Sequence, residues 1–353
     1  MPTDINKNRR DLSTLLSRAP HTSKAPCRVD IGGTWDIKAF SLPWHYLRPS
    51  TVNVALSLYT SVTLVPDEAG WISVESEGFD TERHAAESAP FNTPLGFVFA
   101  VATYFNVSGV RIKIRSESPP RSALGGSGVL GVALIHAFSK VVADLDGGEL
   151  SRENIVRLAY ELENGLSVSL CGMQDQAGAA FGGINQWIWM ADGTFVRNEL
   201  VGLDAVDEFK EHMLVAYCGQ VHDSVDVNSV WLKSFVSGYH RESWFKINAL
   251  THQFAAAIRD GNWRDAIQAM NLETELRIGL TPSVLVQSTN ALVQAARDLG
   301  CGARFCGAGG GGCVWALGER DDIVNLRHEW SELLDGFHGG RLLEAEIDSV
   351  GVR

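Results

Sequence analysis

The sequence lacks any hydrophobic run long enough to cross a membrane. Its most apolar stretch, residues 95–105, is well short of the roughly 20 residues that a bilayer-spanning helix needs. The N-terminal residues 1–23 are polar, and the pair Arg9 and Arg10 is followed by no apolar segment, so we do not expect them to act as a secretory signal. We therefore expect no membrane partner, and a flexible lead-in over residues 1–24.

Paired cysteines are also lacking. The six cysteines are scattered, with no C-x-x-C pair and no histidine at the spacing of a zinc site. This pattern predicts reduced thiols in a cytoplasmic protein.

Positive charge is scarce as well. Acidic residues number 42 and basic residues 30, which gives a formal net charge of -12. A field of this sign repels phosphate polymers, so nucleic acid is not an expected partner. A small anionic ligand is not excluded, because helix N-termini and backbone amides bind phosphate whatever the net charge.

What the sequence does have is the size and composition of a two-domain globular protein. Its 353 residues, 45% hydrophobic and 20% charged, exceed the roughly 150 residues of an average domain. From residue 204 onward the sequence pattern changes to a short apolar run followed by long helical stretches. We therefore predict an N-terminal domain over residues 25–203 and a C-terminal domain over residues 204–353. Association into a homodimer stays open.

A strand, a glycine loop and a helix follow one another in the first half. Residues 110–115 alternate apolar and basic side chains, which predicts a strand with one buried face. Two prolines end it, and the apolar residues from 129 to 145 predict a buried helix. A second helix is expected to begin near Ser151 and to carry Glu163 in its last turn. In the second half we expect helical stretches over residues 231–258, 266–276 and 282–299, then a strand over residues 313–317.

Two glycine loops, residues 126–131 and 307–312, match the loose pattern G-x-G-x-x-G. Neither has the setting of a Rossmann dinucleotide site, and no Gly-Lys-Ser/Thr of a Walker loop occurs. The first loop does open a helix, where unpaired N–H groups and the helix dipole favour a bound phosphate. The alternative is a tight, solvent-filled turn. Ser127 adds a hydroxyl of the kind that ligates magnesium.

Two aspartates stand in glycine-rich surroundings. Asp175 lies between Gly172 and Gly178, which indicates a functional acid, although an aspartate capping a turn is the alternative. Asp36, just after a Gly-Gly-Thr-Trp run, allows the same two interpretations. Arg28 lies in an expected strand, either as a structural ion-pair partner or as a charge that lowers the pKa of a neighbouring acid.

Three motifs, in order, resemble those of the GHMP kinases, the superfamily of galactokinase, homoserine kinase, mevalonate kinase and phosphomevalonate kinase. APCRVDIGGTWD at residues 25–36 resembles the N-terminal substrate motif of that family. PPRSALGGSGVLG at residues 119–131 is similar to its phosphate loop, and GAGGGG at residues 307–312 to its C-terminal glycine motif. The stretches at residues 174–176 and 218–224 are similar to the sugar kinase branch, which includes L-fucose kinase and D-glycero-D-manno-heptose 7-phosphate kinase.

The resemblance implies a mixed α/β (α+β), two-domain GHMP-kinase fold with the active site between the domains, and ATP and Mg²⁺ as cofactors. Asp175 would take or orient the proton of the attacking hydroxyl, with Arg28 beside it, and Ser127 and Glu163 would ligate magnesium. The resemblance assigns ATP binding to Leu124, Gly125, Gly126, Ser127 and Gly128, and substrate binding to Asp36, Gly219, His222, Gly309 and Gly310.

The chain also departs from the family pattern. Ala123 replaces the first glycine of the phosphate loop, and Gly126 replaces its first hydroxyl-bearing residue. His222 stands where the sugar branch often has arginine, and residues 37–39 replace Thr-Pro-Pro. These departures bear on the substrate more than on the chemistry.

The sequence thus favours a kinase that transfers the γ-phosphate of ATP to a hydroxyl, in particular an anomeric hydroxyl, of a sugar or sugar phosphate. The alternatives are a kinase of a non-sugar alcohol, a sensor that binds ATP and sugar without turnover, and, more distantly, a dinucleotide-dependent oxidoreductase. A carboxylate or phosphate on the acceptor would need a basic contact, for which the sequence offers Lys38, Arg48, Arg121, His222 and Arg304.

Overall fold

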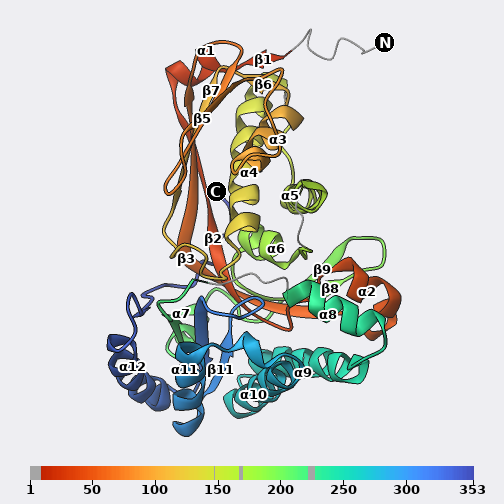
Figure 1. The fold of residues 1–353 in the computed structure, drawn as a ribbon, viewed down its shortest axis with the longest axis vertical. Coiled ribbons are helices and arrows are strands. Elements are labelled where there is room, and N and C mark those ends of the chain that lie inside the picture. The colour runs from red at the N-terminus through yellow and green to blue at the C-terminus, as the bar shows by residue number, and fades with distance from the viewer. Residues whose placement is uncertain (1–8, 147, 167–169, 222–226) are drawn as a thin grey trace.

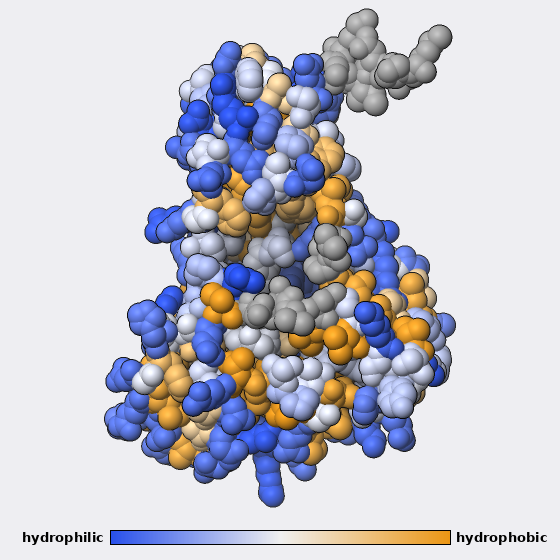
Figure 2. All heavy atoms as spheres, viewed as in Figure 1, coloured by the Kyte–Doolittle hydropathy of each residue, from blue (hydrophilic) through white to orange (hydrophobic). Residues whose placement is uncertain are grey.

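The chain folds into two lobes stacked along its long axis (Figure 1). The computed structural model describes residues 9–146, 148–166, 170–221 and 227–353. Long strands and the helices beside them form the upper lobe of Figure 1, and shorter strands with a larger set of helices form the lower one. The space-filling view shows hydrophilic side chains spread over both lobes, with hydrophobic ones among them (Figure 2).

A seven-stranded sheet is the frame of the first lobe. Its order is β5-β4-β7-β3-β8-β9, with β2 paired to β3. Strand β7 confirms the strand predicted over residues 110–115. The antiparallel register of β2 and β3 shifts between Pro26 and Cys27, just before the residues that form the site. The strands are β2 (His21–Ile31), β3 (Ser50–Pro66), β4 (Trp71–Ser76), β5 (Glu82–Ala85), β7 (Val110–Ser116), β8 (Ile184–Trp189) and β9 (Phe195–Glu199).

Four helices lie along one side of this sheet (Figure 1). They are α3 (Gly96–Tyr104), α4 (Gly126–Asp146), α5 (Arg152–Leu166) and α6 (Gln174–Phe181). The helices predicted after the glycine loop and near Ser151 are confirmed as α4 and α5, and Glu163 lies in the last turn of α5. Helix α4 alone, among the described helices, is long and apolar enough to span a membrane, but 72% of its most apolar window is buried inside the fold. Its apolarity is that of a core helix.

The flexible lead-in predicted over residues 1–24 is wrong from Arg10 onward. Strand β1 (Arg10–Asp11) pairs with β6 (Val107–Ser108), helix α1 (Ser13–Arg18) follows, and β2 begins at His21. Leu12 and Leu16 are fully or almost fully buried in the main core. Their burial holds the segment against the sheet. The mostly polar composition of the segment does not predict this contact.

The second lobe is built on a four-stranded sheet of order β11-β12-β10-β13. Strand β12 confirms the strand predicted over residues 313–317. The helical stretch expected over residues 231–258 is two helices, α8 and α9, which separate where Gly238 and His240 take left-handed φ angles of 88° and 58°. The strands are β10 (Met213–Tyr217), β11 (Gly302–Phe305), β12 (Cys313–Leu317) and β13 (Arg341–Leu342). The helices are α7 (Val206–Lys210), α8 (Val227–Val236), α9 (Arg241–Arg259), α10 (Trp263–Leu280), α11 (Gln287–Asp298) and α12 (Arg320–Asp335).

Short helical turns connect these elements. Helix α2 (Lys38–Ser41) and the 3₁₀ turn η2 (Leu42–Leu47) join β2 to β3, and η3 (Pro282–Val284) lies between α10 and α11. All six cysteines are free, as predicted.

The last residues of the chain return to the first lobe. The backbone of Asp348 bonds Ala55 and Gly183, and that of Arg353 bonds Lys24 in both directions. In sequence order, β9 is the last strand of the first sheet and β10 is the first strand of the second sheet, and residue 203 lies between them. The domain division over residues 25–203 and 204–353 itself stays a prediction. The last residues of the chain would belong to the second domain by this division, yet they bond to the first lobe.

Candidate active site

Asp175 and Arg28 form the central ion pair of the site. Helix α6 puts Asp175 in its first turn, and β2 carries Arg28. The Arg28 Nε and Nη2 donate to Asp175 Oδ1 at 2.8 and 2.6 Å. Burial would lower the pKa of Arg28, but Asp175 and Asp30 raise it overall, so the guanidinium stays charged. The Asp175 carboxylate thus binds a neighbouring strand and does not cap a turn, which was the alternative.

The glycine loop before α4 packs directly on Asp175. A Cβ added to Gly125 would lie 3.0 Å from Asp175 Cγ, and one added to Gly128 would lie 2.8 Å from Asp175 Cβ. Arg28 fixes the preceding loop, because its Nη1 donates to the Ala123 carbonyl at 2.8 Å and its backbone N–H to that of Leu124 at 3.3 Å. The start of α4 and the acid on α6 therefore lie side by side.

Glu163 of α5 and Ser127 of α4 approach the same point. Gln176 Nε2 donates to Glu163 Oε2 at 2.6 Å. Burial raises the pKa of Glu163, whereas hydrogen bonds from Ser127 and Gln176 lower it, and the balance is a raised pKa. The hydrogen-bond partners of this half-buried carboxylate are neutral, and a carboxylate with a hydroxyl is a hard-oxygen donor pair that suits Mg²⁺. In the described parts of the chain, no three His, Cys, Asp or Glu side chains cluster into a metal site of their own.

Asp36 is a second acid near Asp175. Its Oδ2 accepts from the Gln174 backbone N–H at 3.0 Å, while its buried Oδ1 has no hydrogen-bond partner. Burial raises the pKa of Asp36 to about 6, and the nearby Asp175 adds to that effect. The chain comes this close only because residue 172 is glycine: a Cβ there would lie 1.8 Å from Asp36 Oδ2.

Arg28 is also the first link of a buried chain of alternating charges. Its Nη1 lies 3.3 Å from Asp30 Oδ1, and Arg304 Nη1 lies 3.0 Å from Asp30 Oδ2. Arg304 Nε then pairs with Glu273 Oε2 at 3.0 Å. Asp30, Arg304 and Glu273 have fully buried side chains.

The chain of charges ends on the N-terminal motif. Arg277 Nε donates to Glu273 Oε1 at 2.5 Å, and Arg277 Nη2 donates to the Gly33 carbonyl at 2.5 Å. Three acids and three arginines thus alternate from Asp175 to the loop that carries Asp36. The sequence did not point to Glu273 or Arg277. Arg304, which the sequence offered as one possible basic contact for an acidic acceptor, is fully buried and pairs with Asp30 and Glu273, while its Nη2 has no hydrogen-bond partner.

The C-terminal glycine motif packs against these elements from the second lobe. The Gly307 N–H donates to Asp30 Oδ1 at 2.8 Å. A Cβ added to Gly312 would lie 2.6 Å from the Ser122 carbonyl oxygen, within the phosphate-loop motif. Gly309 and Gly310 instead meet Val284, whose carbonyl accepts the Gly310 N–H at 2.8 Å. The contact with the site therefore comes from Gly307 and Gly312.

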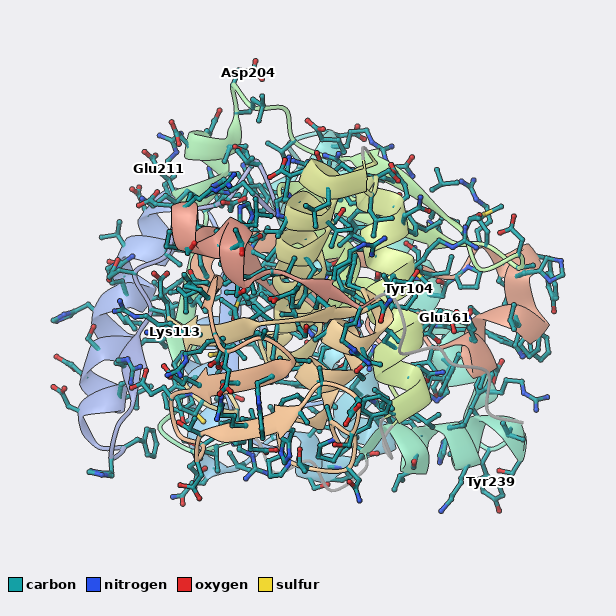
Figure 3. All side chains as sticks on the ribbon, turned by 90° about the horizontal axis from the view of Figure 1, so that it is seen from above. Tyr104, Lys113, Glu161, Asp204, Glu211 and Tyr239 are labelled. Carbon is teal, nitrogen blue, oxygen red and sulfur yellow. The ribbon has the colours of Figure 1, made fainter. Side chains whose placement is uncertain are left out.

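The remaining predicted residues have other surroundings. Gly219 has a φ of 81°, and a Cβ there would lie 2.4 Å from the His338 carbonyl oxygen, so close packing is reason enough for glycine. His222 lies outside the described residues. Lys38 pairs with Glu161 at 2.6 Å, and Figure 3 labels Glu161 at the outer surface of α5.

Taken together, the geometry suits transfer of an anionic group. The start of a 21-residue helix offers backbone N–H groups for a phosphate chain. The Asp175 carboxylate lies beside it and is partly exposed, and Arg28 supplies the balancing positive charge. Phosphoryl transfer demands this combination of positioning and charge neutralisation.

Two segments of the chain match known protein families. Residues 92–183 match the N-terminal domain of the GHMP kinases, and residues 254–336 match their C-terminal domain. The first match contains the loop before α4 together with Glu163 and Asp175. The second contains Glu273, Arg277 and the C-terminal glycine motif.

Individual relatives include kinases of different acceptors. Mevalonate kinase of Thermococcus sibiricus is 25% identical over 299 residues, which cover 77% of this chain and 83% of that one. D-glycero-alpha-D-manno-heptose 7-phosphate kinase of Campylobacter jejuni is 33% identical over 174 residues, 46% of this chain and 49% of that one. L-fucokinase/L-fucose-1-P guanylyltransferase of Bacteroides fragilis is 22% identical over 336 residues, 83% of this chain and 34% of that one.

Solved structures share the fold. Galactokinase of Lactococcus lactis, complexed with galactose, superposes with a TM-score of 0.73 at 17% identity and covers 97% of this chain and 99% of that one. A fold likeness at this identity carries no information on the acceptor.

Proposed function

The chain belongs to the GHMP kinases, phosphotransferases that act on hydroxyl groups, and from that premise we propose that it phosphorylates a hydroxyl of a sugar or sugar phosphate. The observation that carries the proposal is the unpartnered, buried Oδ1 of Asp36 close to Asp175. Polyols are recognised by acceptors of this kind, each of which takes a hydrogen bond from one hydroxyl.

The proposed roles follow from the contacts. GHMP kinases use ATP, and we place its phosphates along residues 124–128, at the N-terminus of α4. Asp175 accepts or orients the proton of the attacking hydroxyl. Arg28 holds that carboxylate through two N–H donors and thereby fixes its position. A positioned acid of this kind typically contributes about 10² to 10⁴-fold to the rate.

Magnesium, in this proposal, is bound by the Ser127 hydroxyl and the Glu163 carboxylate, and phosphate oxygens and water complete its shell. The metal supplies neutralisation of the charge that develops on the phosphate oxygens. Gln176 orients Glu163 by a hydrogen bond of 2.6 Å. Its own Oε1 is buried without a partner, which leaves an acceptor in the same place.

A non-sugar alcohol is the second candidate, because archaeal mevalonate kinases match most of the chain. The charges around Asp175 argue against an acceptor that carries a carboxylate. Asp36, Asp175 and Glu163 are all acidic, while Arg28 and Arg304 are engaged with acids of the protein. A neutral polyol avoids the repulsion that a carboxylate, or the phosphate of a sugar phosphate, would meet beside these acids, so the charges favour a free sugar among the proposed acceptors.

Acceptor-dependent ADP release tests the proposal. Purified protein with ATP and magnesium is assayed against free and phosphorylated hexoses, 6-deoxyhexoses and heptoses, with mevalonate as the competing alcohol. We expect turnover with a member of the sugar set. Turnover with mevalonate alone would transfer the assignment to the second candidate, and measurable sugar binding without turnover would favour a sensor.

The variant Asp175→Asn tests the chemical role. We expect it to retain ATP affinity and to lose at least about 10²-fold in turnover, because a positioned acid is removed. The matched control is Asp192→Asn, which changes an exposed aspartate in the β8–β9 turn. Near-normal turnover in Asp175→Asn would remove this residue from the reaction.

A further inference from the structure

A second cavity of about 620 Å³ lies between helix α9 and strands β8 and β9. It shares no lining residue with the site around Asp175. Three arginines line it, namely Arg48 at the end of η2, Arg197 of β9 and Arg259 of α9, and Glu199 is the one acid among the lining residues. Its volume falls within the range of roughly 300–1,000 Å³ typical of small-molecule sites.

The charge of this cavity opposes that of the molecule. The chain as a whole carries a formal net charge of -12, yet three arginines line this one cavity. Arg197 is neutralised by Glu199 at 3.0 Å. Arg48 and Arg259 have no carboxylate within salt-bridge distance in the described part of the chain, so their charges add. A concave surface of one sign focuses the field and attracts the opposite charge.

One part of the cavity wall is held by hydrogen bonds. Arg197 Nε donates to Asn185 Oδ1 at 2.7 Å, and its guanidinium lies over the Phe181 ring at 5.2 Å. Gln186 is buried, and its Nε2 donates to Ser50 Oγ at 3.1 Å and to His252 Nδ1 at 3.0 Å. These contacts therefore hold Gln186, Arg197 and His252 in place before any ligand binds, while the exposed side chains of Arg48 and Arg259 are left to engage it.

The backbone at Arg48 is held in an unusual conformation. Arg48 has φ and ψ of 52° and 63°, in the left-handed region that residues other than glycine seldom adopt. Pro49 follows it, and the helical region of φ and ψ is disfavoured for a residue that precedes proline. His252 Nε2 donates to the Arg48 carbonyl at 2.9 Å, since its Nδ1 accepts from Gln186. Strain of this kind persists where the surroundings over-determine it, commonly at ligand sites.

We propose that this cavity is a binding site for a small metabolite that carries a diphosphate group. Guanidinium groups bind phosphate oxygens through two parallel N–H donors. Arg48 and Arg259 supply the two free forks, and Arg197, already paired, supplies a fixed wall. Two adjacent phosphates match two unpaired arginines in charge and in donor number.

Calorimetric titration with inorganic pyrophosphate tests the proposal. The protein is first saturated with a non-hydrolysable ATP analogue, so that the loop before α4 is occupied. We expect one further saturable site whose Kd rises at least about tenfold in Arg48→Gln and in Arg259→Gln, because each removes a charge-assisted phosphate contact. Both side chains are exposed, so both variants should fold, which the thermal midpoint checks.

Arg264→Gln is the matched control, since it removes the same charge from an exposed arginine outside the cavity lining. We expect it to leave the Kd for pyrophosphate unchanged. No saturable binding to the unaltered protein at millimolar pyrophosphate, or equal Kd values in all variants, would overturn the site. Inorganic phosphate should bind at least about tenfold more weakly than pyrophosphate, because it engages one arginine fork and not two. Equal affinity for the two probes would overturn the diphosphate class.

Discussion

Arg28 and Arg304 hold opposite oxygens of the Asp30 carboxylate, at 3.3 Å from Oδ1 and 3.0 Å from Oδ2. Arg28 belongs to the first lobe and Arg304 to the second, so this one buried carboxylate joins the two. Burial alone would raise the pKa of Asp30, but Arg304 and Arg28 lower it overall. Asp30 therefore stays charged and keeps both arginines in place, and Arg28 in turn holds Asp175.

Glu273→Gln should destabilise the fold strongly. It takes the negative charge from between Arg304 and Arg277, both fully buried. Leaving a buried charge without its partner costs about 3–5 kcal/mol of unfolding free energy, which urea denaturation measures. The control Glu275→Gln changes an exposed glutamate of the same helix that lies 3.4 Å from Arg297, and we expect a loss below about 1 kcal/mol. Equal losses of unfolding free energy in the two variants would contradict a stabilising role for the buried chain of charges.

Asp36→Asn should stabilise the protein at alkaline pH and not at acidic pH. The folded-state pKa is raised to about 6 from 3.8, so above pH 6 a charged carboxylate is buried at a cost of up to about 3 kcal/mol. As the pH falls from 6 towards 4, Asp36 gains its proton in the folded protein first, and the cost disappears. The difference in unfolding free energy between variant and parent should therefore shrink over this window. A difference independent of pH would show that Asp36 is not buried in charged form.

Ser127→Ala and Glu163→Gln should each weaken the response of the reaction to magnesium, because each removes a hard oxygen ligand. The measurement is turnover as a function of free magnesium, and we expect the half-saturating concentration to rise in both variants. Glu161→Gln is the control, since it alters an exposed carboxylate of the same helix that pairs with Lys38. A magnesium titration that matches the parent in both site variants would assign these residues another role.

Gly125→Ala should reduce turnover, whereas Gly126→Ala should fold normally. Gly125 has a φ of 85°, and its added methyl group would lie 3.0 Å from Asp175 Cγ, so the aspartate must shift. A methyl group on Gly126 meets no atom within 4 Å and needs no positive φ. Steady-state kinetics with thermal denaturation separates the two effects. Full activity in Gly125→Ala would mean that the contact with Asp175 does not position the acid.

The sequence was informative where function requires a recognisable local pattern. The alternation at residues 110–115 predicted β7, since it reflects one buried face, and the apolar stretch after the glycine loop predicted α4, since that helix is buried on most sides. The resemblance to the GHMP kinases placed Asp175 beside Arg28, and the two do form an ion pair. The roles assigned to them are still predictions.

The buried chain of charges was not predictable in the same way. Glu273 and Arg277 are four residues apart on a helix, a spacing typical of an exposed surface pair. This pair is buried because it contacts groups distant in sequence: Glu273 pairs with Arg304, and Arg277 donates to the Gly33 carbonyl. The prediction of a flexible lead-in over residues 1–24 was wrong for a related reason. Leu12 and Leu16 are isolated apolar residues among polar neighbours, and their burial depends on a sheet formed by residues later in the sequence.

The return of the last residues to Lys24 and Ala55 means that the second lobe is tethered to the first at both of its ends. The polypeptide therefore crosses between the lobes twice. Two crossings restrict twisting of one lobe against the other more than a single crossing would, which helps to keep Gly307 against Asp30.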